Sequence, residues 1–268
     1  MKDFIKDKKI IDFHTHPYLS SENDICQHTE FCDRSPKTTL KVMEKLGVKT
    51  FCGSVISVAP LKENETRWDR IKKLNEEALE LRRLYNGKYI PGFHVHPDYI
   101  EESVKEIDKF AALGLKLIGE LVPYMDGWEK YDNPALNEIA DYAATKNMII
   151  SLHTMPDEDD LDRFVAAHKN ITIVAAHPGE KRIALRHIER LKKYDNYYLD
   201  LSGTGLFRYG LLRRLIDEGG AEKILYGSDY PTCNPSTFIG GVLLDDLITD
   251  KEREAILYKN AQRILGIK

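Results

Sequence analysis

The sequence predicts an α/β protein with the architecture of a (β/α)8 TIM barrel, formed by one domain over residues 1–268. Eight short segments rich in apolar and β-branched residues alternate with longer segments of helical periodicity. Such alternation makes a parallel sheet, and eight strand–helix units close it into a barrel. The alternative is a doubly wound open sheet, which would be expected to bring a glycine-rich phosphate loop after the first strand, and the sequence has none there.

Strands are expected where apolar and β-branched residues run together and a histidine or turn residue follows. The first such segment reads Ile-Ile-Asp-Phe-His-Thr-His and is ended by Pro17. Two later segments, Met-Ile-Ile-Ser-Leu-His and Ile-Thr-Ile-Val-Ala-Ala-His, also end on a histidine. The expected strands cover residues 10–16, 50–58, 89–96, 114–122, 148–153, 171–177, 197–201 and 223–227.

Helices are expected between these strands, where apolar residues recur at helical spacing. Gly47 closes the first helix and Asn86-Gly87 the second, while Pro134 occupies the first turn of another. The expected helices cover residues 38–46, 67–85, 99–113, 134–146, 159–168, 182–193, 210–218, a short piece at 240–248, and 251–265.

Composition narrows the class of partner. The net charge is −4 with mixed signs, so we expect a small-molecule substrate and no nucleic acid or membrane surface. No apolar run is long enough to span a bilayer, and the N-terminal sequence MKDFIKDKKI lacks the apolar segment of a signal peptide. The four cysteines are irregularly spaced and suggest no disulfide framework, which favours a cytoplasmic protein.

Cys26-x-His28-x3-Cys32 lies in a long polar connection between residues 17 and 36. Its spacing matches no common structural zinc site, and no fourth ligand is near in sequence. We therefore expect a loop beside the active site with incidental thiols.

The first expected strand delivers two histidines, His14 and His16, to one face, because side chains two positions apart on a strand point the same way. By the strand rise they stand about 6.5 Å apart. Two neutral imidazoles side by side make half of a site for zinc or another divalent transition metal. The alternative is that one histidine packs and the other is solvated. The third strand carries a second pair, His94 and His96, also followed by proline.

Strand ends gather at one rim of a barrel, so polar residues far apart in sequence become neighbours there. Six of the nine histidines are at expected strand ends, where Glu120 of strand four and Asp229 after strand eight join them. His168 and His187 are on expected helices, and we expect them at the surface. A ring of imidazoles and carboxylates predicts a divalent metal site. The residues of this rim are His14, His16, His94, His96, Glu120, His153, His177 and Asp229.

With these motifs in place, the sequence resembles the amidohydrolase superfamily. The resemblance is carried by Asp-Phe-His-Thr-His on strand one, by the single histidines that end strands five and six, and by Gly-Ser-Asp-Tyr-Pro after strand eight. It is most similar to the family-2 branch, the metal-dependent TIM-barrel hydrolases related to aminocarboxymuconate semialdehyde decarboxylase. The closing segment Tyr-Lys-Asn-Ala-Gln-Arg-Ile-Leu at 258–265 resembles the last helix of that branch, so the likeness covers the chain.

The resemblance implies roles for individual residues. His14, His16 and His153 match metal ligands, and Asp229 matches the carboxylate that binds metal and takes a proton from the attacking water. His177 matches a histidine that polarises substrate in single-metal members and binds metal in two-metal members.

Strand four departs from the two-metal relatives that carry a carboxylated lysine there. Lys116 and Glu120 share one face of this strand, and Glu120 lies about 13 Å nearer the rim. We therefore expect Glu120 to be the ligand and Lys116 to lie low in the barrel. The alternative for Glu120 is an ion pair with a cation at the rim.

The predicted function is hydrolysis of an ester, lactone or amide bond of a small molecule by a metal-activated water, with Asp229 as base and His177 holding the oxyanion. Zinc is the expected metal, as one or two ions, and manganese, iron or cobalt fit the same ligands. His94, His96, Tyr124 and Arg208 are expected to contact substrate, or the histidine pair to be hydrogen-bonded at the rim. A homodimer is an ordinary assembly for such a barrel.

Two other functions stay open. The first is non-oxidative decarboxylation of an aromatic or unsaturated acid on the same metal, for which Arg208, Arg34 or the His94 and His96 pair would grip the carboxylate. The second is a catalytically silent barrel that binds a ligand or a partner protein, and absence of bound metal in the purified protein would favour it.

Overall fold

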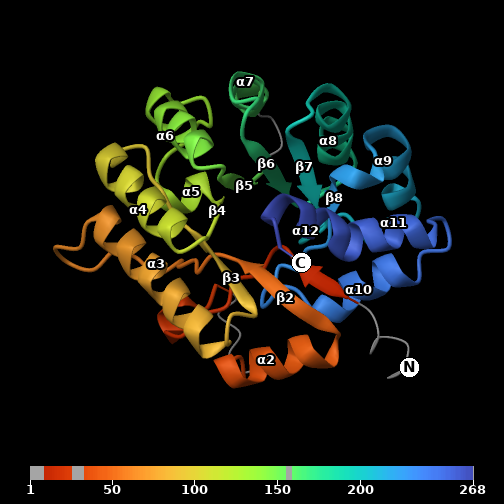
Figure 1. Ribbon diagram of the computed structural model, residues 1–268, viewed down its shortest axis with the longest axis horizontal. Helices are drawn as coiled ribbons and strands as arrows, with labels where there is room; N and C mark the ends of the chain where they lie inside the picture. The colour runs from red at the N-terminus through yellow and green to blue at the C-terminus, as the bar shows by residue number, and fades with distance from the viewer. Residues whose placement is uncertain (1–8, 26–32, 155–158, 268) are drawn as a thin grey trace.

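The strands of the computed structural model, which describes residues 9–25, 33–154 and 159–267, form one parallel sheet in the order β1 to β8. Each strand pairs with the next one along the chain, as a barrel of βα units requires. In Figure 1 the strands occupy the centre of the molecule. Their bounds are β1 Ile10–Asp12, β2 Val48–Gly53, β3 Tyr89–Phe93, β4 Leu117–Leu121, β5 Ile149–His153, β6 Thr172–Ala176, β7 Tyr197–Asp200 and β8 Ile224–Leu225.

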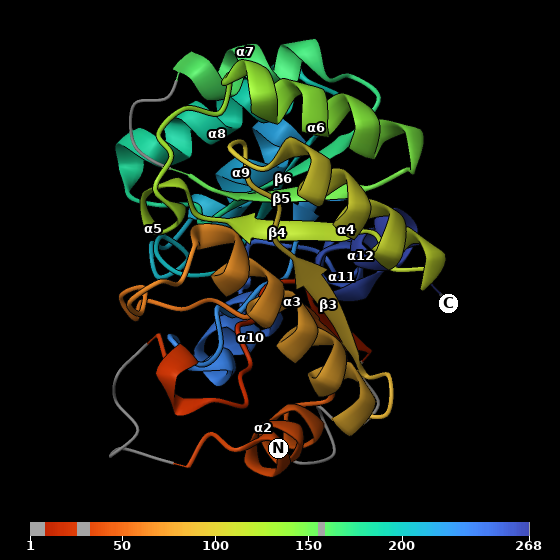
Figure 2. The same cartoon turned by 90° about the vertical axis from the view of Figure 1, so that its left-hand side faces the viewer.

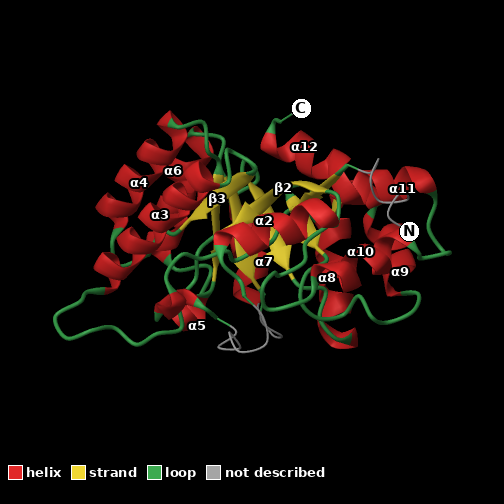
Figure 3. Ribbon diagram, turned by 90° about the horizontal axis from the view of Figure 1, so that it is seen from below, coloured by secondary structure: helices red, strands yellow, loops and turns green. Residues whose placement is uncertain are grey.

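Helices cover the outside of this sheet, as Figures 2 and 3 show from two further directions. They follow the strands in alternation along the chain. Their bounds are α2 Pro36–Lys45, α3 Arg67–Leu84, α4 Ile100–Ala112, α5 Pro123–Asp126, α6 Pro134–Thr145, α7 Asp159–Ala167, α8 Lys181–Lys193, α9 Leu211–Gly219, α10 Pro235–Leu243, α11 Asp250–Glu254 and α12 Asn260–Leu265. The short 3-10 helices are η1 Ser21–Asn23 and η2 Ala221–Lys223, and the π-helix η3 Ala255–Lys259 joins α11 to α12.

The first and last strands meet through the residues that follow them. The N–H of Phe13 donates to the carbonyl of Tyr226 at 2.9 Å, and Thr15 forms a parallel bridge with Tyr230. These contacts curl the sheet round on itself. The predicted fold class is confirmed: the chain is an α/β protein whose eight parallel strands alternate with helices, consistent with a TIM barrel.

Apolar side chains fill the space between strands and helices. Phe93 at the end of β3 stacks on Phe110 of α4, with ring centroids 4.2 Å apart. Ile107 lies one turn before Phe110 and is also fully buried, so α4 turns one apolar stripe to the sheet. This packing fixes the strand ends, from which the polar residues of the rim project.

Seven of the eight strands end earlier than predicted, and β5 ends at the predicted residue, His153. β1 stops at Asp12 and β3 at Phe93, so both histidine pairs lie just beyond the ladder. The rings of His14 and His16 are therefore not held at strand spacing, and their Nε2 atoms lie 3.0 Å apart.

One helix lies earlier than predicted, at Pro235–Leu243 instead of 240–248. Asn234 caps it, its side chain accepting from the N–H of Ser236, and Pro235 occupies the first turn. Gly240 and Gly241 lie inside this helix.

The surface placement of His168 and His187 was wrong. His187 is fully buried, with Nδ1 2.8 Å from the hydroxyl of Tyr197 and Nε2 3.4 Å from Oγ1 of Thr154. His168 is also buried, with its two ring nitrogens 3.0 Å from Asp141 and 2.7 Å from Asn137. Buried imidazoles need partners for both ring nitrogens, and neighbouring elements supply them here.

Among the described residues, no helix is both long and apolar enough to cross a membrane. The segment with Cys26, His28 and Cys32 lies outside the described residues, so its predicted role as a loop with incidental thiols stays a prediction.

Candidate metal centre

The segment after β1 is fixed against the segment after β8 by the backbone. The N–H of Asp229 donates to the carbonyl of His14 at 2.8 Å, and the N–H of His16 donates to the carbonyl of Tyr230 at 2.6 Å. Asp229 adopts a left-handed conformation with φ of 58°. The two histidines and the aspartate, more than 200 residues apart in sequence, are thereby neighbours.

The Nδ1 atoms of His14 and His16 both have hydrogen-bond partners. His14 Nδ1 lies 2.9 Å from Oδ2 of Asp200, and His16 Nδ1 lies 2.9 Å from the carbonyl oxygen of Ser54. Both partners are acceptors, so both Nδ1 atoms carry hydrogen and donate. The Nε2 atoms keep their lone pairs in the neutral rings and face each other at 3.0 Å. Two lone pairs at that distance repel unless a proton or a metal ion lies between them.

Glu120, at the end of β4, stands in the middle of the histidines. One carboxylate oxygen, Oε2, lies 3.5 Å from His14 Nε2 and 3.4 Å from His16 Nε2. The other, Oε1, lies 3.1 Å from His153 Nδ1 and 3.5 Å from His177 Nε2. Burial alone would raise the pKa of Glu120, but the imidazoles, His14 foremost, hold it well below its usual range.

Asp229 completes the first group of donors. Its Oδ1 lies 3.5 Å from His16 Nε2 and 3.8 Å from His14 Nε2. Among the described residues there are two groups of three potential metal ligands, and within each group the ligand atoms all lie within 4.8 Å of one another. Both groups include His14. The first group adds His16 and Asp229, and the second adds Glu120 and His177.

His153 and His177 lie on the more open side of Glu120, with ring centroids 4.9 Å apart. Burial opposes protonation of His177, but the adjacent Glu120 raises its pKa overall. Burial also lowers the pKa of His14, while Asp200 and Glu120 together raise it well above its usual value. The cluster thus concentrates negative charge that demands protons on the imidazoles or a metal ion.

Tyr124 stands at the edge of this cluster, and its ring centroid lies 5.4 Å from that of His153. Its side chain is 60% exposed, so it borders solvent beside the histidines.

His94 and His96 are buried at the end of β3, but they turn their Nε2 atoms to the backbone. His94 Nε2 lies 2.8 Å from the carbonyl oxygen of Val55, and His96 Nε2 lies 3.0 Å from that of Asp126. The N–H of Asp98 donates to His96 Nδ1 at 3.1 Å. These contacts correspond to the hydrogen-bonded alternative weighed for this pair.

Lys116 lies at the other end of the barrel from the cluster. Its Nζ is 3.8 Å from the position that a Cβ on Gly266 would take, just beyond α12. Figure 3 shows α12 at the opposite end of the molecule from α5, which follows β4.

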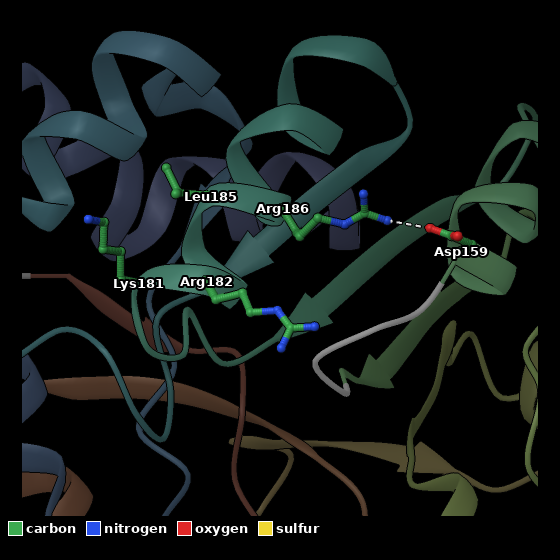
Figure 4. A pocket seen from close by; sticks show the side chains of 5 residues that line it. All are labelled: Asp159, Lys181, Arg182, Leu185 and Arg186. Atoms are coloured by element: carbon green, nitrogen blue, oxygen red, sulfur yellow. Dashed lines mark hydrogen bonds and ion pairs between the residues drawn. The ribbon is translucent and has the colours of Figure 1, made fainter.

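Arg208 is exposed in the segment after β7 and forms an ion pair with Glu180, with Nη2 2.5 Å from Oε2. It lines a cavity of about 400 Å³ together with Gly203 and Phe238, among others. A second cavity, of about 560 Å³, lies at the start of α8 (Figure 4), where Arg186 bonds Asp159 at 2.7 Å. It contains none of the clustered histidines and is lined by Asp159, Lys181, Arg182, Leu185 and Arg186.

Three groups that orient the histidines were not predicted from the sequence: Ser54, Asp200 and Ser202. Asp200 ends β7, and Ser202 follows it, where the hydroxyl lies 3.0 Å from His177 Nδ1. The available signal was an acid and a hydroxyl two positions apart at a strand end. Ser54 acts through its carbonyl, which leaves no signal in the sequence.

Comparison with known proteins identifies the family. The sequence profile of the family described as Amidohydrolase matches residues 11–267. No curated protein sequence matches. Solved structures match over nearly the whole chain, at identities that show likeness of fold alone.

Three of these structures show the range of activities described for proteins of similar fold. A Staphylococcus aureus protein described as an amidohydrolase superposes with a TM-score of 0.73 at 19% identity, covering 97% of this chain and 100% of that one. The 5-carboxyvanillate decarboxylase of Novosphingobium aromaticivorans, complexed with manganese, gives 0.69 at 15%, covering 98% and 97%. A probable 2-pyrone-4,6-dicarboxylic acid hydrolase of Acinetobacter baumannii gives 0.66 at 13%, covering 96% and 99%.

Proposed function

Because the chain belongs to the amidohydrolase family, we propose that it is a metal-dependent hydrolase that cleaves an ester, lactone or amide bond of a small molecule. One observation carries the proposal. The Nε2 atoms of His14 and His16 face each other at 3.0 Å while acceptors occupy both Nδ1 atoms. Two imidazole nitrogens that face each other with their lone pairs free are suited to hold a divalent metal between them.

The donors that would hold the metal are His14 Nε2, His16 Nε2, Asp229 Oδ1 and Glu120 Oε2. Imidazole and carboxylate together suit zinc, which we propose first, and also manganese. Glu120 Oε1 faces His153 Nδ1 and His177 Nε2, so these three residues would be the ligands for a second ion. We propose that Glu120 and His153 are ligands, with one or two ions bound.

The metal, when bound, supplies a Lewis acid and lowers the pKa of water. One side chain then transfers the proton, and another stabilises the developing charge. Asp229 accepts the proton of the attacking water and returns it to the leaving group. His177 carries hydrogen on Nδ1 at rest, and after it gains a proton at Nε2 it donates from Nε2 to the oxygen on which negative charge develops; the neighbouring Glu120 favours that proton.

Substrate contacts follow from what surrounds the cluster. Tyr124 borders His153 and is exposed, so it can cover one side of a bound substrate. His94 and His96 would act by shaping the rim, because their Nε2 atoms are bonded to backbone carbonyls. Arg208 would reach an acidic substrate only by leaving Glu180.

Decarboxylation of an aromatic or unsaturated acid is the second candidate. The observation that favours it is the likeness of fold to the manganese-containing 5-carboxyvanillate decarboxylase. A decarboxylase needs a cation for the substrate carboxylate, and the two arginines considered for this are engaged. Arg34 bonds Asp24 at 2.5 Å, and Arg208 bonds Glu180 at the same distance. The balance of contacts therefore favours hydrolysis.

A substrate panel on the zinc-loaded and the manganese-loaded protein tests the proposal. Esters, lactones, amides and aromatic acids are offered, and hydrolysis product and carbon dioxide are both measured. We expect hydrolysis product, loss of turnover on chelation, and loss of turnover with retained metal in Asp229→Asn. Release of carbon dioxide from an aromatic acid would establish the second candidate, and a protein that binds no divalent metal would favour the silent barrel. Cytoplasmic location, a homodimer and a single domain over 1–268 stay predictions.

A further inference from the structure

The end of β7 carries a buried acid and a buried hydroxyl that the proposed reaction does not use. Asp200 and Ser202 are both fully buried. Oδ2 of Asp200 lies 2.9 Å from His14 Nδ1, and Oγ of Ser202 lies 3.0 Å from His177 Nδ1 and, at a longer distance of 3.2 Å, near His14 Nδ1. Two side chains from one strand end thus contact two imidazoles from two other strands.

The direction of each hydrogen bond follows from the chemistry of the groups. Asp200 accepts from His14 Nδ1–H, from the N–H of Ser202 at 2.9 Å and from the hydroxyl of Ser202. Since the Ser202 hydroxyl donates its one hydrogen to Asp200, its oxygen must accept from His177. His177 therefore carries hydrogen on Nδ1 and turns Nε2 toward Glu120.

Glycines leave room for this arrangement. Gly203 has φ of 65°, and a Cβ added there would lie 2.3 Å from His177 Nδ1. A Cβ on Gly227 would lie 2.8 Å from Cβ of His14 and 3.0 Å from Oδ1 of Asp200. The imidazoles and the β7 pair are therefore packed too closely for a ring to turn freely.

We propose that Asp200 and Ser202 are positioning residues, each of which orients a different histidine. Asp200 orients the ring of His14 as a metal ligand. Ser202, which is itself hydrogen-bonded to Asp200, orients the ring of His177, which faces the reacting atoms. The inference rests on the proposed function for the part that concerns turnover. Asp200 should therefore govern metal affinity, whereas Ser202 should govern His177 and turnover.

Three variants of the full-length, zinc-loaded protein separate these duties. Asp200→Asn removes the charge that holds His14, and Ser202→Ala removes the hydroxyl that holds His177. Ser202→Thr keeps the hydroxyl and is the matched control. Zinc affinity is measured by competition with a chelator, and the hydrogen-bearing nitrogen of His177 is identified by 15N NMR of the imidazole.

We expect Asp200→Asn to weaken zinc binding about 10–100-fold, the usual cost of losing a group that orients a ligand. Ser202→Ala should keep zinc affinity within about threefold, lose the single Nδ1–H form of His177 and lower kcat about tenfold or more. Ser202→Thr should restore the NMR signature.

Two results would overturn the proposal: an unchanged Nδ1–H form of His177 in Ser202→Ala, or loss of zinc in Ser202→Ala as severe as in Asp200→Asn. If Ser202→Thr does not fold, the NMR comparison of Ser202→Ala with the unaltered chain still decides. The NMR and affinity measurements need no substrate, so they stay decisive even if the protein hydrolyses nothing in the panel.

Discussion

The chain contains the same tripeptide pattern twice, and the two copies have different chemistry. His14-Thr-His16 and His94-Val-His96 each follow a barrel strand, each precede a proline, and all four rings are buried. In the first pair both Nδ1 atoms donate to oxygen and both Nε2 atoms converge. In the second pair both Nε2 atoms are bonded to backbone carbonyls that are far apart in sequence.

The difference teaches that the partner of one ring nitrogen decides the use of the other. Asp200 and the carbonyl of Ser54 leave two lone pairs aimed at one point beside Glu120 and Asp229. A site for a cation results. The second pair instead ties β3 to the segments that contain Val55 and Asp126, which is a structural duty.

The largest expected effect comes from breaking the first pair. His16→Ala removes one of two facing nitrogens, and metal affinity should fall by at least about a hundredfold, because loss of an orienting group alone costs 10–100-fold. Turnover should be lost with it. Elemental analysis after dialysis, with kcat measured at saturating metal, checks this. Metal content equal to that of the unaltered protein would place the ion elsewhere.

A substitution in the second pair should lower the stability of the fold and leave metal affinity nearly unchanged. His96→Ala leaves the carbonyl of Asp126 and the N–H of Asp98 without their partner, which should lower the free energy of unfolding by about 1–3 kcal/mol. Metal affinity should stay within about threefold, as for sites that share no partner. Urea unfolding and chelator competition measure the two quantities. A metal loss as large as that of His16→Ala would erase the contrast between the pairs.

A smaller effect concerns His187, a third kind of histidine that is buried and bonded to side chains. Burial lowers its pKa to about 3. The unfolded chain, with a pKa of about 6.5, therefore binds a proton that the folded chain excludes, and stability falls as the pH drops below that value. Between about pH 7.5 and about pH 5.5 the contribution of His187 to the free energy of unfolding should fall by about 1 kcal/mol.

His187→Gln is the variant that isolates this contribution, because glutamine does not titrate. Its unfolding free energy should depend less steeply on pH than that of the unaltered protein over the same interval, by urea unfolding at each pH. Parallel curves for the two proteins would show that His187 titrates alike in both states.

The clustering of the polar residues at the rim could be predicted from sequence, because closure of a barrel brings the strand ends together whatever segments connect them. The positions of these residues at or just beyond the ends of their strands were enough to expect neighbours, and the structure places them within contact: His14, Glu120, His153, His177 and Asp229. Helix ends with strong caps were also predictable, as at Pro134.

The use of each ring could not be predicted, because it depends on which acceptor meets Nδ1. Both histidine pairs have the same spacing, and the acceptors are backbone carbonyls or a carboxylate on another strand. The burial of His187 was missed for the same reason, since its partners come from other elements. The position of α10 was missed because Gly240 was read as a boundary, while Asn234 and Pro235 begin the helix.

Anomalous diffraction from crystals of the protein grown with zinc tests the central claim most directly. The account predicts an anomalous peak about 2 Å from Nε2 of both His14 and His16, with oxygen ligands from Asp229 and Glu120, and none at His94 or His96. A cluster without bound zinc, or a peak at His94 and His96, would contradict it.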